Sequence, residues 1–372
     1  MSYLRNINVR WGCFDLTDVL KMRFKDDEVE RYMIEKGDLV LCEGGEPGRC
    51  AIWDKANPIM FQKALHRIRC HGGVLNEYLK YVIEDYAKAN KLEEYYTGST
   101  IKHLIGESLV SILFPLPPIK EQERIVQEIQ RYLSLVAIIE NNKEKLLAAI
   151  KQAKSKVLEL AIHGKLVPQD PNDEPARELL KRINPKAEIT CDTPQYGKLP
   201  KGWCETLLGN IGNWQSGATP SRLRKDYYNG DIPWLKTGDL NDSVIKSIPE
   251  TITRKALEET SVKLNPTGSV LIAMYGATIG KIGILALPAT TNQACCACVD
   301  YMCDKMFLFY FLLANRKRFI AMGGGGAQPN ISKEKITNTH IPLPPLSEQY
   351  RIVARIEELF AQLDKIESSL QA

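Results

Sequence analysis

Residues 115–129 read PLPPIKEQERIVQEI, and residues 342–356 read PLPPLSEQYRIVARI, with ten of the fifteen positions identical. A phrase repeated within one chain indicates that one structural unit is used twice. After each copy, apolar residues recur at alternating steps of four and three, which is the spacing of a coiled-coil seam. The predicted seam consists of Ile125, Ile129, Tyr132, Val136, Ile139, Leu146, Ile150, Val157 and Leu160 after the first copy, and Ile352, Ile356, Leu359, Leu363, Ile366 and Leu370 after the second.

The repeat extends upstream of this phrase. GDLVLCEGGEPGRCAI (37–52) resembles GSVLIAMYGATIGKIGI (268–284), and YLRNINV (3–9) falls opposite WLKTGDL (234–240). Each unit is therefore predicted to consist of a strand-rich domain, a Pro-Leu-Pro-Pro segment that ends this domain, and a long helix. The stretch 202–233 has no counterpart in front of Met1, so we expect the first domain to lack the equivalent opening segment.

Composition permits two globular domains and excludes few functions. The chain has 372 residues, of which 44% are hydrophobic, and its net charge of +4 permits nucleic-acid binding without requiring it. The first residues lack the charged-then-apolar pattern of a signal peptide, and the longest apolar run, 306–314, is too short to span a bilayer. We therefore expect a cytoplasmic protein with no membrane association.

The cysteines could form a metal site or a buried strand. Ten are present, and a reducing cytosol favours free thiols. Cys295, Cys296, Cys298 and Cys303 lie close together, but the alternation in ACCACV is typical of a buried strand in which Cys acts as a small hydrophobe. We predict the strand and no bound metal.

The predicted fold class is α+β, with two strand-rich α/β domains in a pseudo-twofold arrangement, separated by an antiparallel coiled coil of two long helices. The alternatives for the helices are a bundle core or a homodimer seam. The predicted segments are a first domain at 1–118, N-terminally incomplete, a central helix at 119–163, a linker at 164–201, a second domain at 202–345 and a distal helix at 346–372.

Signatures of catalysis are lacking in the sequence. The stretch from Gly276 to Lys281 resembles a phosphate loop, but it has three residues between its glycines instead of four, and Ile282 stands where the motif needs Ser or Thr. There is no GxSxG elbow and no HExxH pair. We therefore predict no catalytic residue, and nuclease or methyltransferase activity in the chain itself is the disfavoured alternative.

Polar, glycine-rich loops in the second domain combine cations, hydroxyls, amides and aromatics. Such groups can contact phosphates and base edges, and an amide can pair bidentately with adenine, although each loop alone is also compatible with ordinary turn chemistry. Together the loops favour a recognition surface. The predicted DNA-binding residues are Thr219, Ser221, Arg222, Arg224, Lys225, Lys236, Tyr275, Thr278, Lys281, Gln328 and Asn330 in the second domain, and Arg5, Arg49, Ser99, Thr100 and Lys102 in the first.

The chain resembles the specificity (S) subunit of type I restriction-modification systems. The matching text is IPWLKTGDLND (232–242), GSVLIAMYGATIGK (268–281), TTNQACCAC (290–298), GGAQPNISKEKI (325–336) and PLPPLSEQ (342–349), together with HGKLVPQDPNDEPA (163–176). The resemblance implies a non-catalytic reader of double-stranded DNA, in which two target-recognition domains each read half of a bipartite site. It also implies docking of two methyltransferase subunits and of restriction motor-nuclease subunits, with methyl donor and ATP on those partners and no cofactor on this chain.

The start of the chain departs from this family. A counterpart of 202–233 is expected there, so the first reader is hypothesised to be impaired. The alternative function is a scaffold or decoy that binds methyltransferase subunits without reading DNA.

Overall fold

The computed structural model describes residues 1–98, 100–187, 189, 195–324 and 330–370. The chain divides into two compact units, Met1–Asn142 (unit 1) and Lys143–Ala372 (unit 2), and each is described by itself. Both are mixtures of short strands and helices. The predicted α+β fold class is confirmed.

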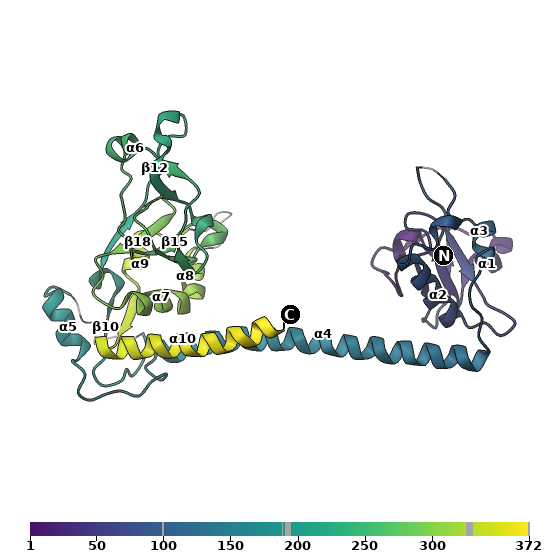
Figure 1. Cartoon of the computed structure of the whole chain (residues 1–372), viewed down its shortest axis with the longest axis horizontal. Helices are drawn as coiled ribbons and strands as arrows, with labels where there is room; N and C mark the ends of the chain where they lie inside the picture. Colours follow the sequence, from purple (N-terminus) through teal and green to yellow (C-terminus); the bar gives the residue numbers. More distant parts are fainter. Residues whose placement is uncertain (99, 188, 190–194, 325–329, 371–372) are drawn as a thin grey trace. The chain divides into compact units, whose positions relative to one another are not determined.

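A five-stranded sheet forms the centre of unit 2 (Figure 1). Its order is β11 (Asn213–Ser216), β18 (Cys295–Val299), β15 (Val270–Ala273), β16 (Ile282–Leu285) and β13 (Ser243–Ile245). Neighbours are antiparallel except β13 and β16, which run parallel. A second sheet has the order β14 (Thr251–Ile252), β12 (Tyr228–Leu235) and β17 (Thr290–Thr291), and a third pairs β10 (Cys204–Leu207) with β19 (His340–Leu343).

Strand β18 separates two hydrophobic cores. Cys296 and Cys298 face a core that includes the apolar helix α7 (Lys305–Ala314), whereas Cys295, Ala297 and Val299 face a core shared with Leu235 of β12. All five strand residues are buried, so the predicted buried strand is confirmed. Burial raises the pKa of the Cys296 thiol to about 12. Among the described residues, no group of three or more His, Cys, Asp or Glu side chains could hold a metal ion.

Unit 1 repeats these pairings, as the sequence predicts. One sheet has the order β7 (Cys50–Ile52), β6 (Leu39–Cys42) and β9 (Leu65–Ile68), with β6 antiparallel to both neighbours as β15 is in unit 2. The other has the order β4 (Leu20–Lys21), β1 (Ser2–Leu4), β8 (Ile59–Phe61) and β5 (Met33–Ile34). Strand β1 is antiparallel to β4 and parallel to β8, which reproduces the pairing of β12 with β14 and β17. Other elements of unit 1 include the hairpin β2 (Val9–Arg10) and β3 (Cys13–Phe14), and the helices α1 (Asp26–Tyr32), α2 (Asn76–Lys88) and α3 (Gly106–Val110).

A buried glutamine explains why the Pro-Leu-Pro-Pro phrase precedes each long helix. The side chain of Gln349 accepts a hydrogen bond from the Asp304 backbone N–H (2.8 Å) and donates to the Pro344 carbonyl (2.9 Å). Its counterpart Gln122 accepts from the Leu75 N–H (2.9 Å) and donates to the Pro117 carbonyl (2.8 Å). Both are fully buried, and they satisfy backbone groups that proline and the helix start leave unpaired.

The two long helices are α4 (Ile119–Ile162) and α10 (Leu346–Ser369). Within unit 2 they pack antiparallel: Lys154 forms ion pairs with Asp364 (2.6 Å) and Glu367 (2.8 Å), while Gln169, just beyond α4, donates to Glu348 near the start of α10 (3.1 Å). Figure 1 shows α10 alongside the C-terminal part of α4. The other helices of this unit include α5 (Ala176–Ile183), α6 (Arg254–Glu259), α8 (Arg316–Met322) and α9 (Lys333–Thr337).

The predicted seam is covered only in part. Ile150, Ile352 and Ile356 are buried, and a further group is half-buried, namely Ile125, Ile129, Val157, Leu160, Leu359, Leu363 and Leu370. Within the chain, the expectation of a covered seam does not hold for Tyr132, Val136, Ile139, Leu146 and Ile366, which are exposed. For the residues of α4 the physical reason is length, because α10 has 24 residues and α4 has 44. Ile366 lies within α10, and length does not explain its exposure. No described helix is long and apolar enough to cross a membrane.

Replacing the buried glutamine of unit 2 should destabilise it. Gln349→Ala leaves a buried N–H and a buried carbonyl without partners, which costs roughly 1–3 kcal/mol of unfolding free energy. Gln362→Ala, on the exposed face of the same helix, is the matched control and should change the unfolding free energy by less than about 0.5 kcal/mol. Urea unfolding followed by circular dichroism measures both, and equal midpoints for the two variants would contradict the assignment.

Candidate nucleic-acid interface

Two loops that are distant in sequence contact the segment 291–294 in unit 2, and Asn330 adjoins the second of them. The Ala218 N–H donates to the Thr291 carbonyl (2.9 Å), and the Thr219 hydroxyl donates to the side-chain oxygen of Gln293. The Met274 N–H donates to the Ala294 carbonyl (2.7 Å). Tyr275 and Asn330 then form an isolated antiparallel bridge. We call this surface the loop face, defined by residues 217–228, 274–281, 291–294 and 330.

Gly217 allows the first of these loops to approach the segment 291–294. A Cβ at this position would lie 2.2 Å from the Thr291 carbonyl oxygen and 2.3 Å from that of Asn292. No side chain fits at such distances, so glycine is required by close approach of two backbones. The path of the first loop therefore depends on this one residue.

The segment 291–294 itself supplies polar groups that sequence reasoning did not place among the site residues. Gln293 is exposed on the loop face, while Asn292 is half-buried next to it. The buried Asn292 Oδ1 and Thr291 Oγ1 have no hydrogen-bond partner among the described residues. The available signal was a polar pair, Asn-Gln, between a threonine strand and an apolar strand in TTNQACCAC. A buried polar atom without a partner is uncommon and marks a candidate site.

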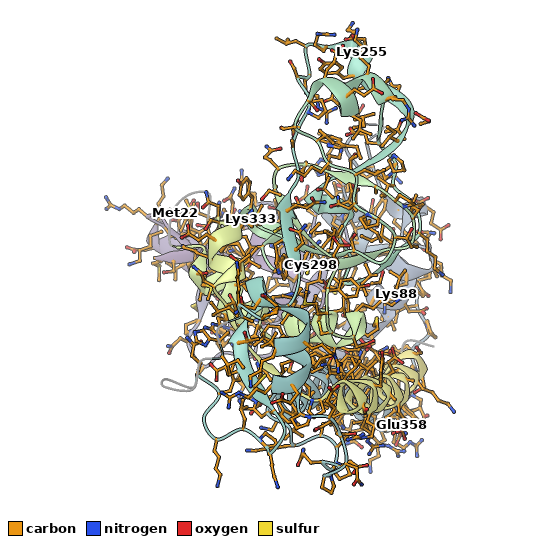
Figure 2. The ribbon with its side chains drawn as sticks, turned by 90° about the vertical axis from the view of Figure 1, so that its left-hand side faces the viewer. Met22, Lys88, Lys255, Cys298, Lys333 and Glu358 are labelled. Carbon is orange, nitrogen blue, oxygen red and sulfur yellow. The ribbon has the colours of Figure 1, made fainter. Side chains whose placement is uncertain are left out.

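Aromatic rings hold the predicted arginines in the first loop. The Arg222 guanidinium lies 4.5 Å from the ring centroid of Tyr228 and 5.0 Å from that of Trp234, and Arg224 lies 4.4 Å from that of Tyr227. Stacking on an aromatic face limits the freedom of a guanidinium while leaving its N–H groups available. Figure 2 shows Lys255 of the adjoining helix α6 at the opposite end of unit 2 from Glu358 of α10, with Cys298 between them.

Carboxylates pair with most of these cations, a feature that the sequence analysis did not predict. Glu250 forms ion pairs with Arg222 (3.1 Å) and Lys236 (3.2 Å), and Asp226 forms them with Arg224 (2.7 Å) and Lys255 (2.9 Å). These cations are therefore not free phosphate ligands in the unbound chain. Because the pairs are largely exposed, each contributes little to stability and can be exchanged for a phosphate. Ser221 and Lys225 are exposed in the same loop.

The pKa values of the carboxyl groups reflect this pairing. Hydrogen bonds from Arg224 and then Lys255 hold the pKa of Asp226 well below its usual range. Burial pushes the pKa of Glu250 upwards, but hydrogen bonds from Arg222 and Lys236 outweigh that effect and the net pKa is lowered. Both groups are therefore ionised at neutral pH. A pocket of about 270 Å³ opens beside them, lined by Arg222, Lys225, Tyr228, Asn229, Glu250 and Thr251.

The second loop combines exposed groups with groups used in its own turn. Tyr275 is exposed, and the Thr278 hydroxyl donates to the Tyr275 carbonyl (2.8 Å). Lys281 is half-buried. Behind the loop, Arg316 donates to the Gly280 carbonyl (2.8 Å) and pairs with Asp242, which anchors the turn. The predicted residue Gln328 lies outside the described residues.

Unit 1 does not gather its predicted site residues in this way. Arg5 pairs with Asp18 (2.6 Å), and Arg49 donates to the Asn6 carbonyl (2.8 Å) and pairs with Glu46 (2.8 Å). Only 13% of the Arg49 side chain is exposed, so its predicted role at phosphates conflicts with its role inside the fold. Thr100 and Lys102 are exposed, with Lys102 paired to Glu93 (2.8 Å), and Ser99 lies outside the described residues.

Comparison with known proteins identifies the family. The family described as "Type I restriction modification DNA specificity domain" matches residues 23–148 and 200–372, which together make up most of the chain. The chain therefore belongs to this family of type I restriction-modification DNA specificity domains.

Individual relatives agree. The chain is 30% identical over 170 residues to the EcoR124I/EcoR124II specificity subunit of Escherichia coli, a match that covers 44% of this chain and 41% of that protein. It is 25% identical over 354 residues to the Escherichia coli EcoBI specificity subunit, covering 92% of this chain and 70% of that protein. The match thus spans less than half the length of the first relative.

Solved structures share the fold. The HsdS subunit from Thermoanaerobacter tengcongensis superimposes with a TM-score of 0.59 at 19% identity, over 99% of this chain and 86% of that chain. A chain from a study of complex assembly and conformational transition of the type I R-M system gives a TM-score of 0.61 at 20% identity, over 91% and 78%. Because the sequence identities are low, these superpositions support the shared fold alone.

Substituting Gly217 should disturb the loop face. In Gly217→Ala the added Cβ meets two backbone oxygens, so the loop must move away from the segment 291–294, at a cost of about 1–3 kcal/mol in unfolding free energy. Gly238→Ala is the matched control, because no atom lies within 4 Å of a Cβ built there. Hydrogen exchange should show faster amide exchange at Ala218 in Gly217→Ala only. Unchanged exchange in that variant would show that the close approach does not position the loop.

Proposed function

We propose that the chain reads DNA sequence for a type I restriction-modification complex, and that the loop face of unit 2 contacts the DNA. The observation that carries the proposal is that two polar loops, at 217–228 and 274–281, both hydrogen-bond to the segment 291–294, while Asn330 is bridged to Tyr275 of the second loop. Family membership supports the same reading, since the family is described by DNA specificity. The loop face contributes amides, a tyrosine and stacked arginines, and this combination suits both base edges and phosphates.

The proposed division of labour follows from the chemistry of the side chains. Exposed amides such as Gln293 and Asn330 have donors and acceptors on one group and can pair with an adenine edge. Arg222 and Arg224 lie at the end of the unit where exposed ion pairs are easily exchanged, so they suit phosphate contacts. Reading needs neither a nucleophile nor a general base, and we propose that the chain is not itself catalytic.

Partner subunits would supply the chemistry. The relatives are named as specificity subunits of restriction enzymes, and one similar structure comes from a study of complex assembly in such a system. For this chain we propose docking of two methyltransferase subunits and, through them, of restriction motor-nuclease subunits, in the cytoplasm. Methyl donor and ATP would then bind to those subunits, and this chain would need no cofactor.

Two substitutions on the loop face distinguish contacts to base edges, which determine sequence preference, from contacts to phosphates, which position the DNA. Gln293→Ala should relax base preference at one position, with a loss of about 1–3 kcal/mol of discrimination, because a base-edge contact is removed. Arg222→Ala should weaken all sequences alike and reduce the salt dependence by about one ion, because a phosphate contact is removed. Selection from a random duplex library by the complex with its methyltransferase, followed by binding at several salt concentrations, measures both effects.

Arg355→Ala is the matched control for these variants, since Arg355 is an exposed arginine of α10 paired with Glu358. It should leave both preference and salt dependence unchanged. Equal effects of all three substitutions would remove the loop face from the proposal. A complex that assembles but selects no sequence would favour the scaffold or decoy alternative.

The length of α4 should set the gap between the two half-sites. Seven residues add about 10 Å to a helix, which corresponds to about three base pairs of duplex. We expect a duplication of residues 133–139, a stretch of α4 that is exposed throughout, to lengthen the recognised gap and to leave the half-site bases unchanged. Methylation-site mapping of the variant complex measures the gap, and an unchanged gap would overturn this role of α4.

A further inference from the structure

The two units differ at one edge of the main sheet. In unit 2 an additional strand covers this edge, and among the described residues of unit 1 no strand does. In unit 2, β11 pairs antiparallel with the outer edge of β18, from Asn213 opposite Val299 to Ser216 opposite Cys296. In unit 1 the equivalent strand is β9, which pairs with β6 just as β18 pairs with β15. Within the part of unit 1 that the structure describes, β9 is the last strand of its sheet. Its outer edge therefore presents backbone groups that can receive another strand.

A groove follows this open edge. It has a volume of about 720 Å³ and is lined by the β9 residues and by Leu109 and Val110 of α3, among others. In unit 2 the equivalent place holds β11, whose Trp214 is buried in the core together with Ile336 of α9. Ile336 is fully buried, whereas its counterpart Leu109 is only half-buried. The groove is thus where the repeat predicts an additional extended segment.

The Pro-Leu-Pro-Pro leucine gives a direct comparison of the two units. Leu343 lies in β19, pairs with Cys204 of β10 and is 2% exposed. Leu116, the same residue of the repeated phrase, is 55% exposed, and its neighbours Leu113 and Val110 are 81% and 85% exposed. Val110 lines the groove beside β9, and the counterpart of Leu116 in unit 2 pairs with the residue Cys204, which precedes β11. We call β9, Val110, Leu113 and Leu116 the open edge.

We propose that the open edge binds an extended segment of another polypeptide, with the chemistry of residues 204–216 of this chain. Backbone hydrogen bonds to β9 would give the affinity, and the groove would receive a large aromatic side chain in the manner of Trp214. Basic side chains line the groove, namely Arg31, Lys63, Arg67 and Arg69, beside His66 and the carboxylate of Glu43. Arg69 is already paired with Glu35 (2.8 Å) and Asp38 (2.5 Å), so the excess of positive charge comes from Arg31, Lys63 and Arg67. The segment is therefore expected to carry an acidic residue, and the inference does not depend on DNA reading.

Another copy of this chain is a poor source for this segment. In each copy, residues 204–207 and 213–216 are already paired with β19 and β18, and Trp214 is buried. Donating them would open the main core of unit 2. Cations along an edge also oppose pairing of two identical edges, because like charges repel. A different polypeptide that carries a free segment of this kind would bind without opening the core of unit 2 and without repulsion between two cationic edges.

A synthetic peptide tests the proposal on the full-length chain. The probe is residues 202–221 of this sequence with a fluorescent label, titrated with the chain and followed by anisotropy. We expect saturable binding, with slower amide exchange at Leu65–Ile68 and no change at Cys295–Val299. A peptide with proline at positions 214 and 215 removes backbone donors and should not bind. Absence of binding at about 1 mM chain would overturn the proposal.

Chain variants locate the binding site. Leu116→Lys should weaken peptide binding at least about tenfold, because it places a charge on the apolar part of the open edge. Leu223→Lys is the matched control, since Leu223 is 94% exposed in unit 2, and it should bind the peptide as the unaltered chain does. Both side chains are exposed, so both variants should fold, which circular dichroism verifies. Equal affinities would overturn the assignment to the open edge.

Three further outcomes would identify a different occupant. Protection of Leu65–Ile68 only when the same peptide is fused ahead of Met1 would show that the segment must be in the same chain. Self-association of the chain in sedimentation, lost in Leu116→Lys, would assign the edge to a second copy. Displacement of the peptide by duplex DNA of arbitrary sequence would assign the cationic groove to nucleic acid. Each of these results would overturn binding in trans to another polypeptide.

Discussion

The structure depends on two buried glutamines, Gln122 and Gln349, that join each strand-rich domain to its long helix. Each accepts from a backbone N–H of its domain and donates to the proline carbonyl at the helix start. Because a fully buried amide that loses a partner is costly, the direction in which each helix leaves its domain is closely constrained. The same interaction occurs twice, so the chain contains one structural unit in two copies.

In unit 2 the loop face lies at the opposite end of the unit from α10 (Figure 2). The strands β15, β16 and β18 are buried on both faces, and their connecting loops therefore carry the exposed polar groups. Gly217 and the hydrogen bond from Met274 to Ala294 bring two of those loops onto one segment, and Asn330 is bridged to the neighbouring Tyr275. The carboxylates of Glu250 and Asp226 pair with Arg222 and Arg224, so these two guanidinium groups are partly neutralised in the unbound chain. A surface of this kind suits recognition and offers no arrangement for covalent chemistry among its described residues.

Much of the fold could be predicted from the sequence, because the repeat and the periodicity are local patterns. Periodicity does not show where α7 ends and α8 begins: the break falls at Asn315, whose side chain donates to the Phe311 carbonyl (3.0 Å). The site was less predictable, because the partners of a cation are set by folding. Glu250 lies 28 residues from Arg222, and no local pattern links them. Gln293 was missed because its exposure depends on how β17 and β18 connect.

The most direct measurement of the central claim, that this chain is a sequence reader with two units, is single-molecule sequencing of methylated DNA from cells that express the chain with its cognate methyltransferase. The account predicts that the modified bases lie in one bipartite motif with a fixed gap. Methylation without a shared motif, in a complex that still assembles, would contradict it.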